Sequence, residues 1–255
     1  MNRIVFCEGK TDAILLGYFL IHVCGFVVIR KGTPKELIVD KVVEKNASFT
    51  AYERNGDYLT IWGVGGKDCF VSALGIFYNR LRKYSDSEMP YEELIMICDR
   101  DKKTIDQEVF EGFSDVFEHS TIDFENRKVL KGSYKNTFGE SKTLSTLGLI
   151  IPKEHDGALE TALLESIREK HSDKEIVDRS TQFVADIRTV ASEYIKTDRL
   201  ELKAKLATVF AIMSPEKVFG FIDELLMTTV KWEEKSTLME LFDPLIQLIN
   251  MEGSY

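Results

Sequence analysis

Blocks of uninterrupted apolar residues alternate with blocks of helical spacing along the first two thirds of the chain. The apolar runs predict strands buried on both faces, at residues 3–7, 26–30, 58–62, 93–98 and 147–152. The intervening blocks place apolar residues at helical spacing, over residues 12–24, 67–83, 104–118 and 157–170. This alternation predicts an α/β fold with a mostly parallel central sheet that is flanked by helices.

The pattern changes after about residue 170, where strand-like runs end. The segments that follow show helical periodicity, at residues 182–195, 200–213, 215–230 and 244–249. We therefore predict a first domain over residues 1–170 and a helical C-terminal region over residues 171–255. Residues 32–57 have the composition of an insertion, with a charged helix over 34–45 and then polar sequence that ends in a turn at Asn55-Gly56-Asp57. Residues 121–130 alternate loosely and indicate an edge strand or a hairpin.

Composition narrows the class of protein. Of the 255 residues, 44% are apolar, which supports a buried core, and the net charge of −9 argues against coating nucleic acid through overall charge. The net charge does not exclude a local basic groove. The cysteines lie in or beside apolar runs and form no CxxC pair, which favours reduced, buried thiols over a zinc site. They are Cys7, Cys24, Cys69 and Cys98.

One uncharged stretch, residues 13–29, invites comparison with a membrane span. It is shorter than the roughly 20 residues that a span requires, contains His22 and is interrupted by Gly25. A helix that ends at the glycine and is followed by a strand explains the stretch better. We therefore expect a soluble, cytoplasmic protein without a membrane partner.

Acidic residues follow two of the predicted strands directly. Glu8 comes after the first strand, and Asp99 and Asp101 come after the fourth. Right-handed crossovers return a parallel chain to the same edge, so these carboxylates should meet at the carboxyl edge, where open α/β sheets bind ligands. Asp12 lies about one turn into the first helix and can face the same crevice.

Carboxylates that meet in this way repel one another unless protons or a cation neutralise them. Oxygen ligands without histidine or cysteine favour Mg²⁺, Mn²⁺ or Ca²⁺. Asp99 and Asp101 are two residues apart, so on an extended segment they point to the same side and can grip one ion. An Asp-x-Asp pair alone is a common polar strand end; its combination with Glu8-Gly9 and Asp12 predicts a metal site.

Two glycine-containing stretches imitate phosphate-binding loops without matching them. Glu8-Gly9-Lys10-Thr11 lacks the first P-loop glycine, because Ile4 occupies that place. Residues 63–68 lack the third glycine of GxGxxG, because Asp68 stands there. Gly65 and Gly66 favour a tight turn with close backbone approach, and their amides are candidates to contact a phosphate.

Taken together, these motifs resemble those of Toprim domains, the fold shared by topoisomerases, bacterial-type primases, ribosomal RNA maturases and the overcoming-lysogenization-defect (OLD) nucleases. The matching residues cover about 1–118 and are Glu8-Gly9, Asp12, Gly65-Gly66 and Asp99-Arg100-Asp101. The chain is most similar to the small stand-alone OLD-type proteins. The ATPase domain that precedes Toprim in full OLD nucleases has no counterpart here, so we expect activity without attached ATP control, or with a separate partner.

The resemblance implies roles for particular residues. The Asp99 and Asp101 carboxylates would hold Mg²⁺ or Mn²⁺, as one ion or two, and Glu8 would bind metal or move protons. The OLD branch adds a glutamate on a helix after the last strand, a place that Glu160 fits; an ordinary first-turn glutamate favoured by the helix dipole is the alternative. Lys10, and less strongly Lys205, are candidates to approach a phosphate, with solvated surface lysines as the alternative.

A basic stretch at residues 127–142 is the candidate nucleic-acid surface. Lys131 and Lys135 are spaced to contact phosphates, and Tyr134 and Phe138 alternate with them as candidates for base stacking. The stretch lies between the Asp-x-Asp pair and Glu160 in the sequence, so we expect it to overhang the site. A solvated basic hairpin is the alternative.

The sequence is compatible with three functions. The first is a Mg²⁺-dependent nuclease that acts on DNA or RNA. The second is a primase-like nucleotidyl transferase, which would bind nucleoside triphosphates together with metal. The third is a non-catalytic, metal-dependent module that binds nucleic acid or a protein partner. The C-terminal helices, with an apolar face over residues 221–232, are candidates for a homodimer or partner interface, or else pack within the chain.

Overall fold

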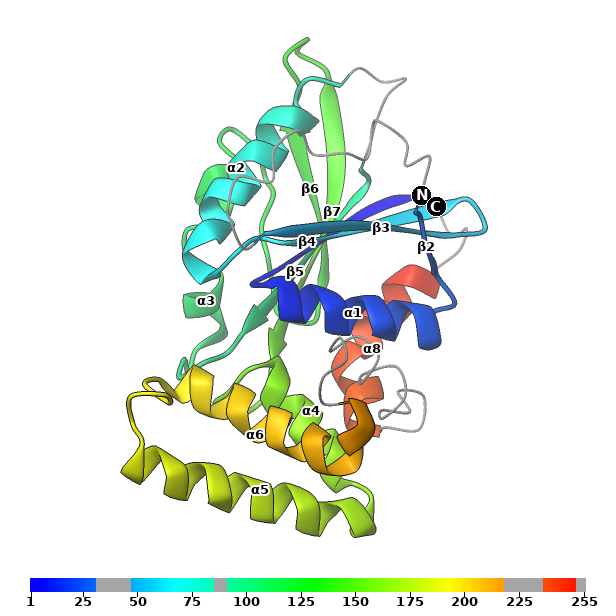
Figure 1. The fold of residues 1–255 in the computed structure, drawn as a ribbon. Coiled ribbons are helices and arrows are strands. Elements are labelled where there is room, and N and C mark those ends of the chain that lie inside the picture. Colours follow the sequence, from blue (N-terminus) through cyan, green and yellow to red (C-terminus); the bar gives the residue numbers. More distant parts are fainter. Residues whose placement is uncertain (31–46, 85–90, 218–235, 251–255) are drawn as a thin grey trace. The chain divides into compact units, whose positions relative to one another are not determined.

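The computed structural model describes residues 1–30, 47–84, 91–217 and 236–250, which form one mixed sheet and a set of helices (Figure 1). The strands are β1 (Asn2–Cys7), β2 (Val27–Val28), β3 (Ser48–Arg54), β4 (Asp57–Gly63), β5 (Glu93–Asp99), β6 (Val129–Lys135) and β7 (Ser141–Ile151). Their order in the sheet is β2-β3-β4-β1-β5-β7-β6. The central strands β4, β1, β5 and β7 are parallel, and the outer strands pair antiparallel. The α/β fold predicted from the sequence is confirmed.

The described residues also form helices between and after the strands. They are α1 (Lys10–His22), α2 (Phe70–Leu81), α3 (Asp106–Val109), α4 (Leu159–Arg168), α5 (His171–Val190), α6 (Asp198–Met213) and α8 (Ser236–Asn250). Figure 1 shows α1 and α2 on opposite faces of the sheet. Both faces of the central strands are therefore covered, which is why β1 and β5 read as continuous apolar runs.

The core beneath α2 is largely aromatic. Phe6 of β1 lies with its ring centroid 5.1 Å from Trp62 and 5.6 Å from Phe77 of α2. Each of these side chains is at most 2% exposed, and burying one aromatic ring contributes about 1.5–3 kcal/mol. This packing joins α2 to the neighbouring parallel strands β1 and β4.

The edge of the sheet differs from the prediction. The run at 26–30 does not form a buried strand: β2 has two residues, and Val27 and Val28 are 62% and 40% exposed at the sheet edge. The segment predicted as an insertion contains β3, which pairs antiparallel with β4. The turn between them is at Asn55-Gly56, where φ is +51° and +86°, as a two-residue hairpin turn requires. The charged helix predicted over 34–45 lies outside the described residues.

The helix predicted over residues 104–118 is wrong as a continuous element. The chain forms only the four-residue α3 and a 3₁₀ turn at Ser114–Val116. Gly112, with φ of +78°, lies between them and breaks the helical path. The aromatic residues that gave the helical spacing pack into the core instead, namely Phe110, Phe113 and Phe117. Residues 121–130, expected to form an edge strand or a hairpin, are mostly irregular: an isolated bridge joins Glu125 to Lys128, and the edge strand β6 begins only at Val129.

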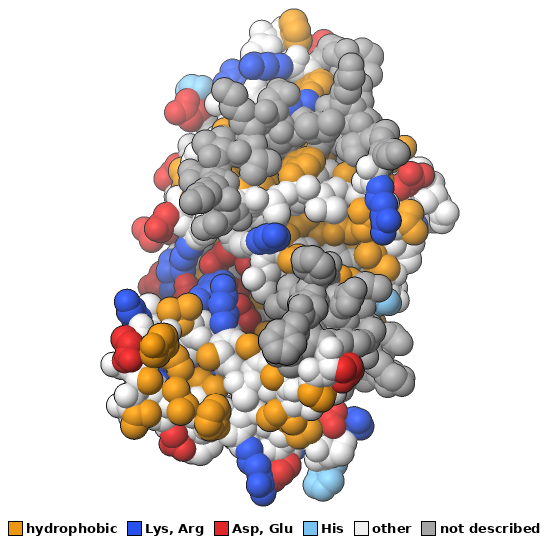
Figure 2. Space-filling view, in the orientation of Figure 1, with side chains coloured by type: hydrophobic (Ala, Val, Ile, Leu, Met, Phe, Trp, Pro, Cys, Tyr) orange, Lys and Arg blue, Asp and Glu red, His pale blue; other side chains and the backbone are white. Residues whose placement is uncertain are grey.

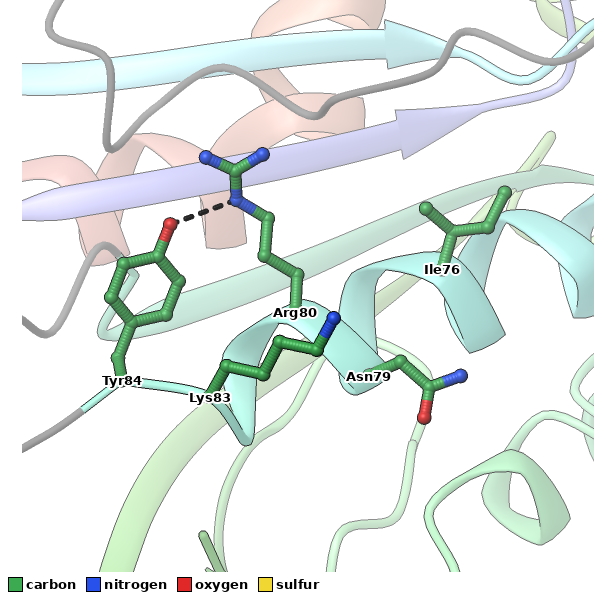
Figure 3. A pocket seen from close by; sticks show the side chains of 5 residues that line it. All are labelled: Ile76, Asn79, Arg80, Lys83 and Tyr84. Carbon is green, nitrogen blue, oxygen red and sulfur yellow. Dashed lines mark hydrogen bonds between the residues drawn. The ribbon is translucent and has the colours of Figure 1, made fainter. Parts of the chain in front are cut away.

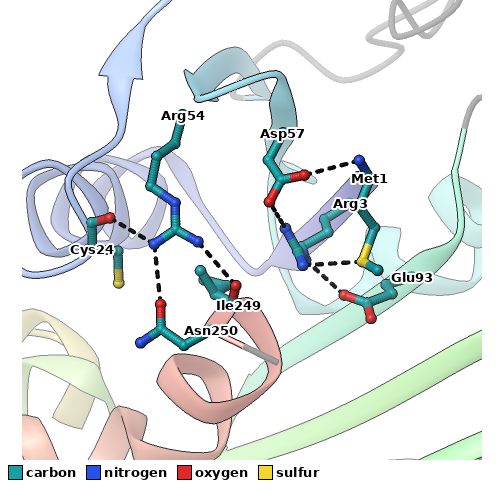
Figure 4. A network of polar contacts seen from close by, with 8 residues as sticks. All are labelled: Met1, Arg3, Cys24, Arg54, Asp57, Glu93, Ile249 and Asn250. Atoms are coloured by element: carbon teal, nitrogen blue, oxygen red, sulfur yellow. Dashed lines mark hydrogen bonds and ion pairs between the residues drawn. The ribbon is translucent and has the colours of Figure 1, made fainter. Parts of the chain in front are cut away.

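The chain forms two compact units, Met1–Asp156 with Pro244–Tyr255, and Gly157–Asp243. The sequence places a boundary near residue 170, whereas the units divide at 157 because α4 packs against α5 and α6. In the first unit, the end of α8 is attached to β3 (Figure 4). The Arg54 guanidinium donates to the Ile249 carbonyl at 2.9 Å and to Asn250 Oδ1 at 3.1 Å.

The second unit keeps apolar side chains on its surface. Figure 2 shows them gathered over the segment that joins α5 to α6, where Val190 and Tyr194 are 78% and 76% exposed. Residues 221–232, which prompted the prediction of a dimer or partner interface, lie outside the described residues, as does nearly all of the helix predicted over 215–230. The interface therefore stays a prediction.

The structure bears on two features noted in the sequence, the cysteines and the uncharged stretch that resembles a membrane span. All four cysteines are free thiols, and only Cys69 is partly exposed. Over the described ranges, none of the helices is both long enough and apolar enough to pass through a bilayer.

Candidate functional site

The candidate site lies at the carboxyl edge of the parallel strands, within the first unit. Cys7, the last residue of β1, is in register with Ile97 of β5, so Glu8 follows β1 beside the end of β5, whose last residue is Asp99. The Asp99 backbone N–H donates to Glu8 Oε1 at 3.3 Å. The two residues are only 6% and 4% exposed, although carboxylates normally face water.

Asp12 joins them through the first turn of α1. Gly9 is the residue before this helix, and its N–H donates to Asp12 Oδ2 at 2.8 Å. The Asp12 carboxylate thus points back to the turn that carries Glu8, and the residue is 4% exposed. The sequence Glu-Gly-x-x-Asp therefore has a local cause, because an acidic residue at this helix position satisfies an N–H that the helix leaves unpaired.

Electrostatics show that these carboxylates share one buried neighbourhood. Burial is the largest cause that raises the pKa of the Cys7 thiol well above its ordinary value. The next largest causes are negative charges, those of Asp12, Asp99 and Glu8. The pKa of the Cys98 thiol is also raised, by burial first and then by Glu8 and Asp99. Three carboxylates thus lie within electrostatic reach of Cys7, and a cation among them would reduce their repulsion.

Asp101 lies beside this group and is more open to solvent. Its φ is +54°, so the chain turns away from the sheet there instead of continuing the extended alternation. The Asp101 carboxylate forms an ion pair with Lys67, and both side chains are about 40% exposed, at 38% and 41%. Burial acts to lower the pKa of Lys67, but the hydrogen bond and charge of Asp101, together with the Glu8 charge, outweigh it and raise that pKa.

Arg100, between the two aspartates, anchors their loop. Its backbone N–H donates to the Ile151 carbonyl at 2.7 Å, which extends the pairing of β5 with β7 by one residue. The guanidinium donates to the Pro152 carbonyl at 3.0 Å and pairs with Asp106 at 2.9 Å. The arginine is 5% exposed and therefore has a structural role in holding Asp99 and Asp101.

The glycine turn after β4 supports Glu8 from the other side. The amides of Gly65 and Gly66 both donate to the Glu8 carbonyl, at 3.1 and 2.7 Å. A Cβ on Gly63 would lie 2.7 Å from the Gly9 carbonyl oxygen, so the two loops touch backbone to backbone. We expected the Gly65 and Gly66 amides to contact a phosphate, but they are already bonded to the protein. Their role is to hold the chain at the end of β1.

Glu160 is the fifth carboxylate that the sequence singled out. It lies in the first turn of α4, in the second unit, and is 1% exposed. Among the described residues neither of its carboxylate oxygens has a hydrogen-bond partner. Burying a carboxylate without compensation is costly, so a positively charged group is expected there. Its assignment as a metal ligand stays a prediction.

The two lysines chosen from the sequence as candidates to approach a phosphate, Lys10 and Lys205, belong to different units. Lys10 is exposed at the start of α1, one residue from Gly9. Lys205 belongs to the helical unit, where it pairs with Glu201 at 2.6 Å. Sequence reasoning missed Lys67, which lies directly after the Gly65-Gly66 turn. The signal for it was available, because a residue that follows a turn at the end of β4 must lie near the ends of the neighbouring strands.

The basic stretch does not overhang the carboxylates. Lys131 of β6 is opposite Ser145 of β7, which is opposite Glu93 at the start of β5. Glu93 precedes Asp99 by six residues on one strand, which separates Lys131 from the site by about 20 Å at ~3.3 Å per residue. Lys135 lies farther still along β6. The expectation failed because β6 runs antiparallel to β7, so the hairpin tip lies at the amino edge of the sheet.

Of the two aromatic residues expected to stack on bases, one is buried and the other is exposed. Tyr134 is 3% exposed and packs against Tyr78, with ring centroids 6.1 Å apart, so it is a core residue and not a base-stacking one. Phe138 is 66% exposed near the tip. Lys131 and Lys135 are both exposed, on the strand face opposite Tyr134.

The residues at the carboxyl edge fit a hard divalent cation by the chemistry of their donors. They offer only carboxylate oxygens, the ligands that Mg²⁺ and Mn²⁺ prefer. Within the residues that the structure describes, no three acidic, histidine or cysteine side chains converge on one point as a finished metal centre. Asp101 in particular is turned to Lys67.

Sequence and structure comparisons place the chain among known proteins. The family described as "Protein of unknown function (DUF3226)" matches residues 2–246. The chain belongs to the DUF3226 family. This DUF3226 chain is also similar to the crystal structure of hypothetical protein PH0156 from Pyrococcus horikoshii OT3, with 17% sequence identity and a TM-score of 0.48. That similarity covers 98% of this chain and 99% of the other. No curated protein matches the sequence.

Proposed function

We propose that this DUF3226 chain is a Mg²⁺- or Mn²⁺-dependent phosphodiesterase that cleaves DNA or RNA, built on a Toprim domain of the OLD type. One observation carries the proposal: Glu8, Asp12 and Asp99 are buried together at the ends of two adjacent parallel strands. Like charges that are buried near one another repel, and a cation that binds among them relieves this repulsion. Proteins keep such an arrangement where it binds a cation or does chemistry.

The proposed ligands are Glu8, Asp12, Asp99 and Asp101, all of the first unit; Glu160 belongs to the second unit and stays a candidate from the sequence alone. A bound divalent cation supplies positive charge that polarises a phosphoryl oxygen and acidifies water. The protein supplies the rest. Glu8 is fixed by the hydrogen bonds to its carbonyl and to Oε1, so its carboxylate can take a proton from an attacking water without reorienting.

Lys67 is the residue that we assign to the substrate phosphate. In this structure its ammonium group pairs with Asp101, where it neutralises part of the acidic cluster. A cation on Asp101 would release that ammonium beside the site. There it can donate to the phosphate oxygens, where charge builds up during cleavage.

The direct test is a cleavage assay on labelled single-stranded DNA, double-stranded DNA and RNA, with Mg²⁺, with Mn²⁺ and with a chelator. We expect cleavage that needs metal, that Asp99→Asn abolishes and that Asp115→Asn retains. Asp115 is an exposed acid on a 3₁₀ turn and serves as the matched control. Full activity of Asp99→Asn, or no cleavage of any substrate by the wild type, contradicts the proposal.

Lys67→Gln should separate metal binding from catalysis. We expect the cleavage rate to fall about 10²-fold, the loss typical of removing one group that stabilises transition-state charge. Mg²⁺ should bind at least as tightly as in the wild type, because a competing ammonium has gone. Calorimetric Mg²⁺ titration and single-turnover cleavage measure the two effects. Lys174→Gln, an exposed lysine of α5, should change neither. Weaker Mg²⁺ binding by Lys67→Gln would assign the lysine a structural role.

The distance between Lys131 and Asp99 predicts a dependence on substrate length. A strand that reaches both residues must span about 20 Å, or roughly six nucleotides at ~3.4 Å each. Lys131→Glu with Lys135→Glu should therefore weaken the binding of long strands and flatten its salt dependence, while four-nucleotide strands bind unchanged. Filter binding at several salt concentrations measures this. Lys174→Glu with Lys196→Glu is the control pair of exposed lysines. An unchanged salt slope for long strands removes β6 from the interface.

A further inference from the structure

Two arginines of the first unit have different kinds of polar contact. Arg80 Nε donates to the Tyr84 hydroxyl at 2.9 Å, and Figure 3 shows that this bond stays at one end of α2. Arg100, between the two aspartates of the candidate site, reaches segments that are far apart in the sequence. Its Nε donates to the Pro152 carbonyl, which follows β7, at 3.0 Å, and its Nη2 lies 2.9 Å from Asp106 Oδ1, at the start of α3. Arg100 therefore ties the loop after β5 to two other parts of the fold.

Asp106 continues this connection to a third segment. Its second oxygen, Oδ2, accepts from Asn126 Nδ2 at 2.8 Å. Asn126 Oδ1 in turn accepts from the Ile150 N–H, near the end of β7, at 3.1 Å. Because a backbone N–H can only donate, it determines which end of the Asn126 amide faces Asp106. The relay from Arg100 to β7 thus has a fixed order: guanidinium, carboxylate, amide, backbone N–H.

The backbone around Asn126 is attached to the same strand. Asn126 forms an isolated parallel bridge with Gly148 of β7, and the Arg127 N–H donates to the Gly148 carbonyl at 2.7 Å. A Cβ on Gly148 would lie 3.0 Å from the Glu125 carbonyl oxygen, so the two backbones approach closely there. Asn126 is therefore a fixed point from which the Asp106 carboxylate can be held.

The loop at the other end of the relay needs such support. Asp101 has a φ of +54°, a left-handed conformation that few non-glycine residues adopt. Its side chain is 38% exposed, so packing around it contributes little to its position. A conformation of this kind persists where neighbouring contacts impose it. Arg100 is the adjacent residue, is itself buried, and makes its contacts on the side of β7 and α3.

We propose that Asp106 and Asn126 are positioning residues for the divalent cation at the carboxyl edge. They hold the Arg100 guanidinium, and the Arg100 backbone sets the directions of Asp99 and Asp101 on either side of it. Asp106 also supplies the opposite charge that a buried guanidinium requires. The proposal rests on the proposed function, because it assigns the relay to the same cation. Groups that orient metal ligands typically change metal affinity about 10–100-fold when they are altered.

Exchanging the two side chains tests the relay through its order of donors and acceptors. Asp106→Asn alone leaves one of two donors, from Arg100 or from Asn126, without its acceptor. Asn126→Asp alone sets two carboxylates face to face. We expect each variant to weaken Mn²⁺ binding about 10–100-fold in a calorimetric titration. The double variant Asp106→Asn with Asn126→Asp again offers acceptors to Arg100 and to the Ile150 N–H, with a donor between them, and should regain most of the affinity.

Melting temperatures in a chelator separate positioning from folding, because a purely structural role would lower them and leave the Mn²⁺ affinity of the folded protein unchanged. Asp186→Asn is the matched control, since Asp186 of α5 is exposed and accepts from Gln182 Nε2 at 2.8 Å; it should bind Mn²⁺ as the wild type does. Single variants with wild-type affinity, or a double variant that regains none of the loss, overturn the relay and leave the phosphodiesterase proposal standing. A wild type that binds no Mn²⁺ overturns both.

Discussion

Asp99→Asn will abolish the stabilisation that Mg²⁺ gives to this protein. If the ion binds only the folded chain, it raises the free energy of unfolding by about 2.7 kcal/mol at a hundred times its dissociation constant. An asparagine side chain keeps the shape of the Asp99 side chain but removes one charge from a neighbourhood that holds Glu8 and Asp12 as well. In a chelator we therefore expect the variant to melt above the wild type, because one source of repulsion has been removed.

Thermal unfolding of both proteins, with Mg²⁺ and with chelator, measures these two effects together. Asp115→Asn, which changes an exposed acid outside the cluster, should keep the full Mg²⁺ shift and the wild-type melting temperature in chelator. An Asp99→Asn variant that retains the whole Mg²⁺ shift would place the ion elsewhere. A variant that melts lower than the wild type in chelator would mean that Asp99 contributes more through hydrogen bonding than it costs through repulsion.

Arg3→Met should lower the free energy of unfolding by about 3–5 kcal/mol, the usual effect of removing one partner from a buried ion pair. Arg3 is 1% exposed and lies directly opposite Glu93 in the sheet, with Nε 2.7 Å from the glutamate oxygen. Its guanidinium also pairs with Asp57 at 3.2 Å (Figure 4). Urea unfolding measures the loss. Arg179→Met, which breaks an exposed pair with Glu175, should cost at most about 0.5 kcal/mol.

The pH dependence of this loss follows from the two carboxylates. Burial raises the pKa of Glu93 despite the attraction of Arg3, and without Arg3 that pKa should rise further. A raised pKa in the folded state adds stability below the ordinary glutamate pKa of about 4.3 and loses it as pH rises. For Asp57, burial acts to raise the pKa, but hydrogen bonds from the Met1 ammonium and Arg3 outweigh it and lower that pKa. The stability that Asp57 adds in the wild type is therefore lost in acid.

The raised pKa of Glu93 and the lowered pKa of Asp57 act in the same direction. The free energy of unfolding that Arg3→Met loses should therefore be larger at pH 8 than at pH 4. Adding Glu93→Leu to Arg3→Met should restore most of the stability, because no buried charge is then left without its partner. A deficit that does not change with pH, and that Glu93→Leu does not relieve, would show that Arg3 stabilises the sheet through packing alone.

The sequence was sufficient to predict the part of the fold that positions the site. β1 and β5 are buried on both faces, so their apolar runs are continuous and their ends are marked by the first charged residues, Glu8 and Asp99. Parallel pairing then brings those ends to one edge. Asp12 could be placed as well, because its spacing from Gly9 is local to the start of a helix.

The remaining features depend on contacts that spacing does not encode. The prediction of a helix over 104–118 was wrong because Gly112 adopts a positive φ and its aromatic neighbours pack into a core made by distant strands. The position of Lys131 depends on the antiparallel register of β6 with β7, which the basic composition of the stretch does not reveal. Lys67 could have been chosen from its place after the Gly65-Gly66 turn, but its pairing with Asp101 is visible only in the structure.

The most direct test of the central claim, that the carboxylates at this edge bind a divalent cation, is a Mn²⁺ titration followed by electron paramagnetic resonance, in which free Mn²⁺ gives the signal. We expect saturable loss of the free-ion signal with the wild type, and Mn²⁺ binding weakened at least tenfold in Asp99→Asn and Glu8→Gln. A wild-type protein that leaves Mn²⁺ free at every concentration, or variants that bind it as the wild type does, would contradict the claim.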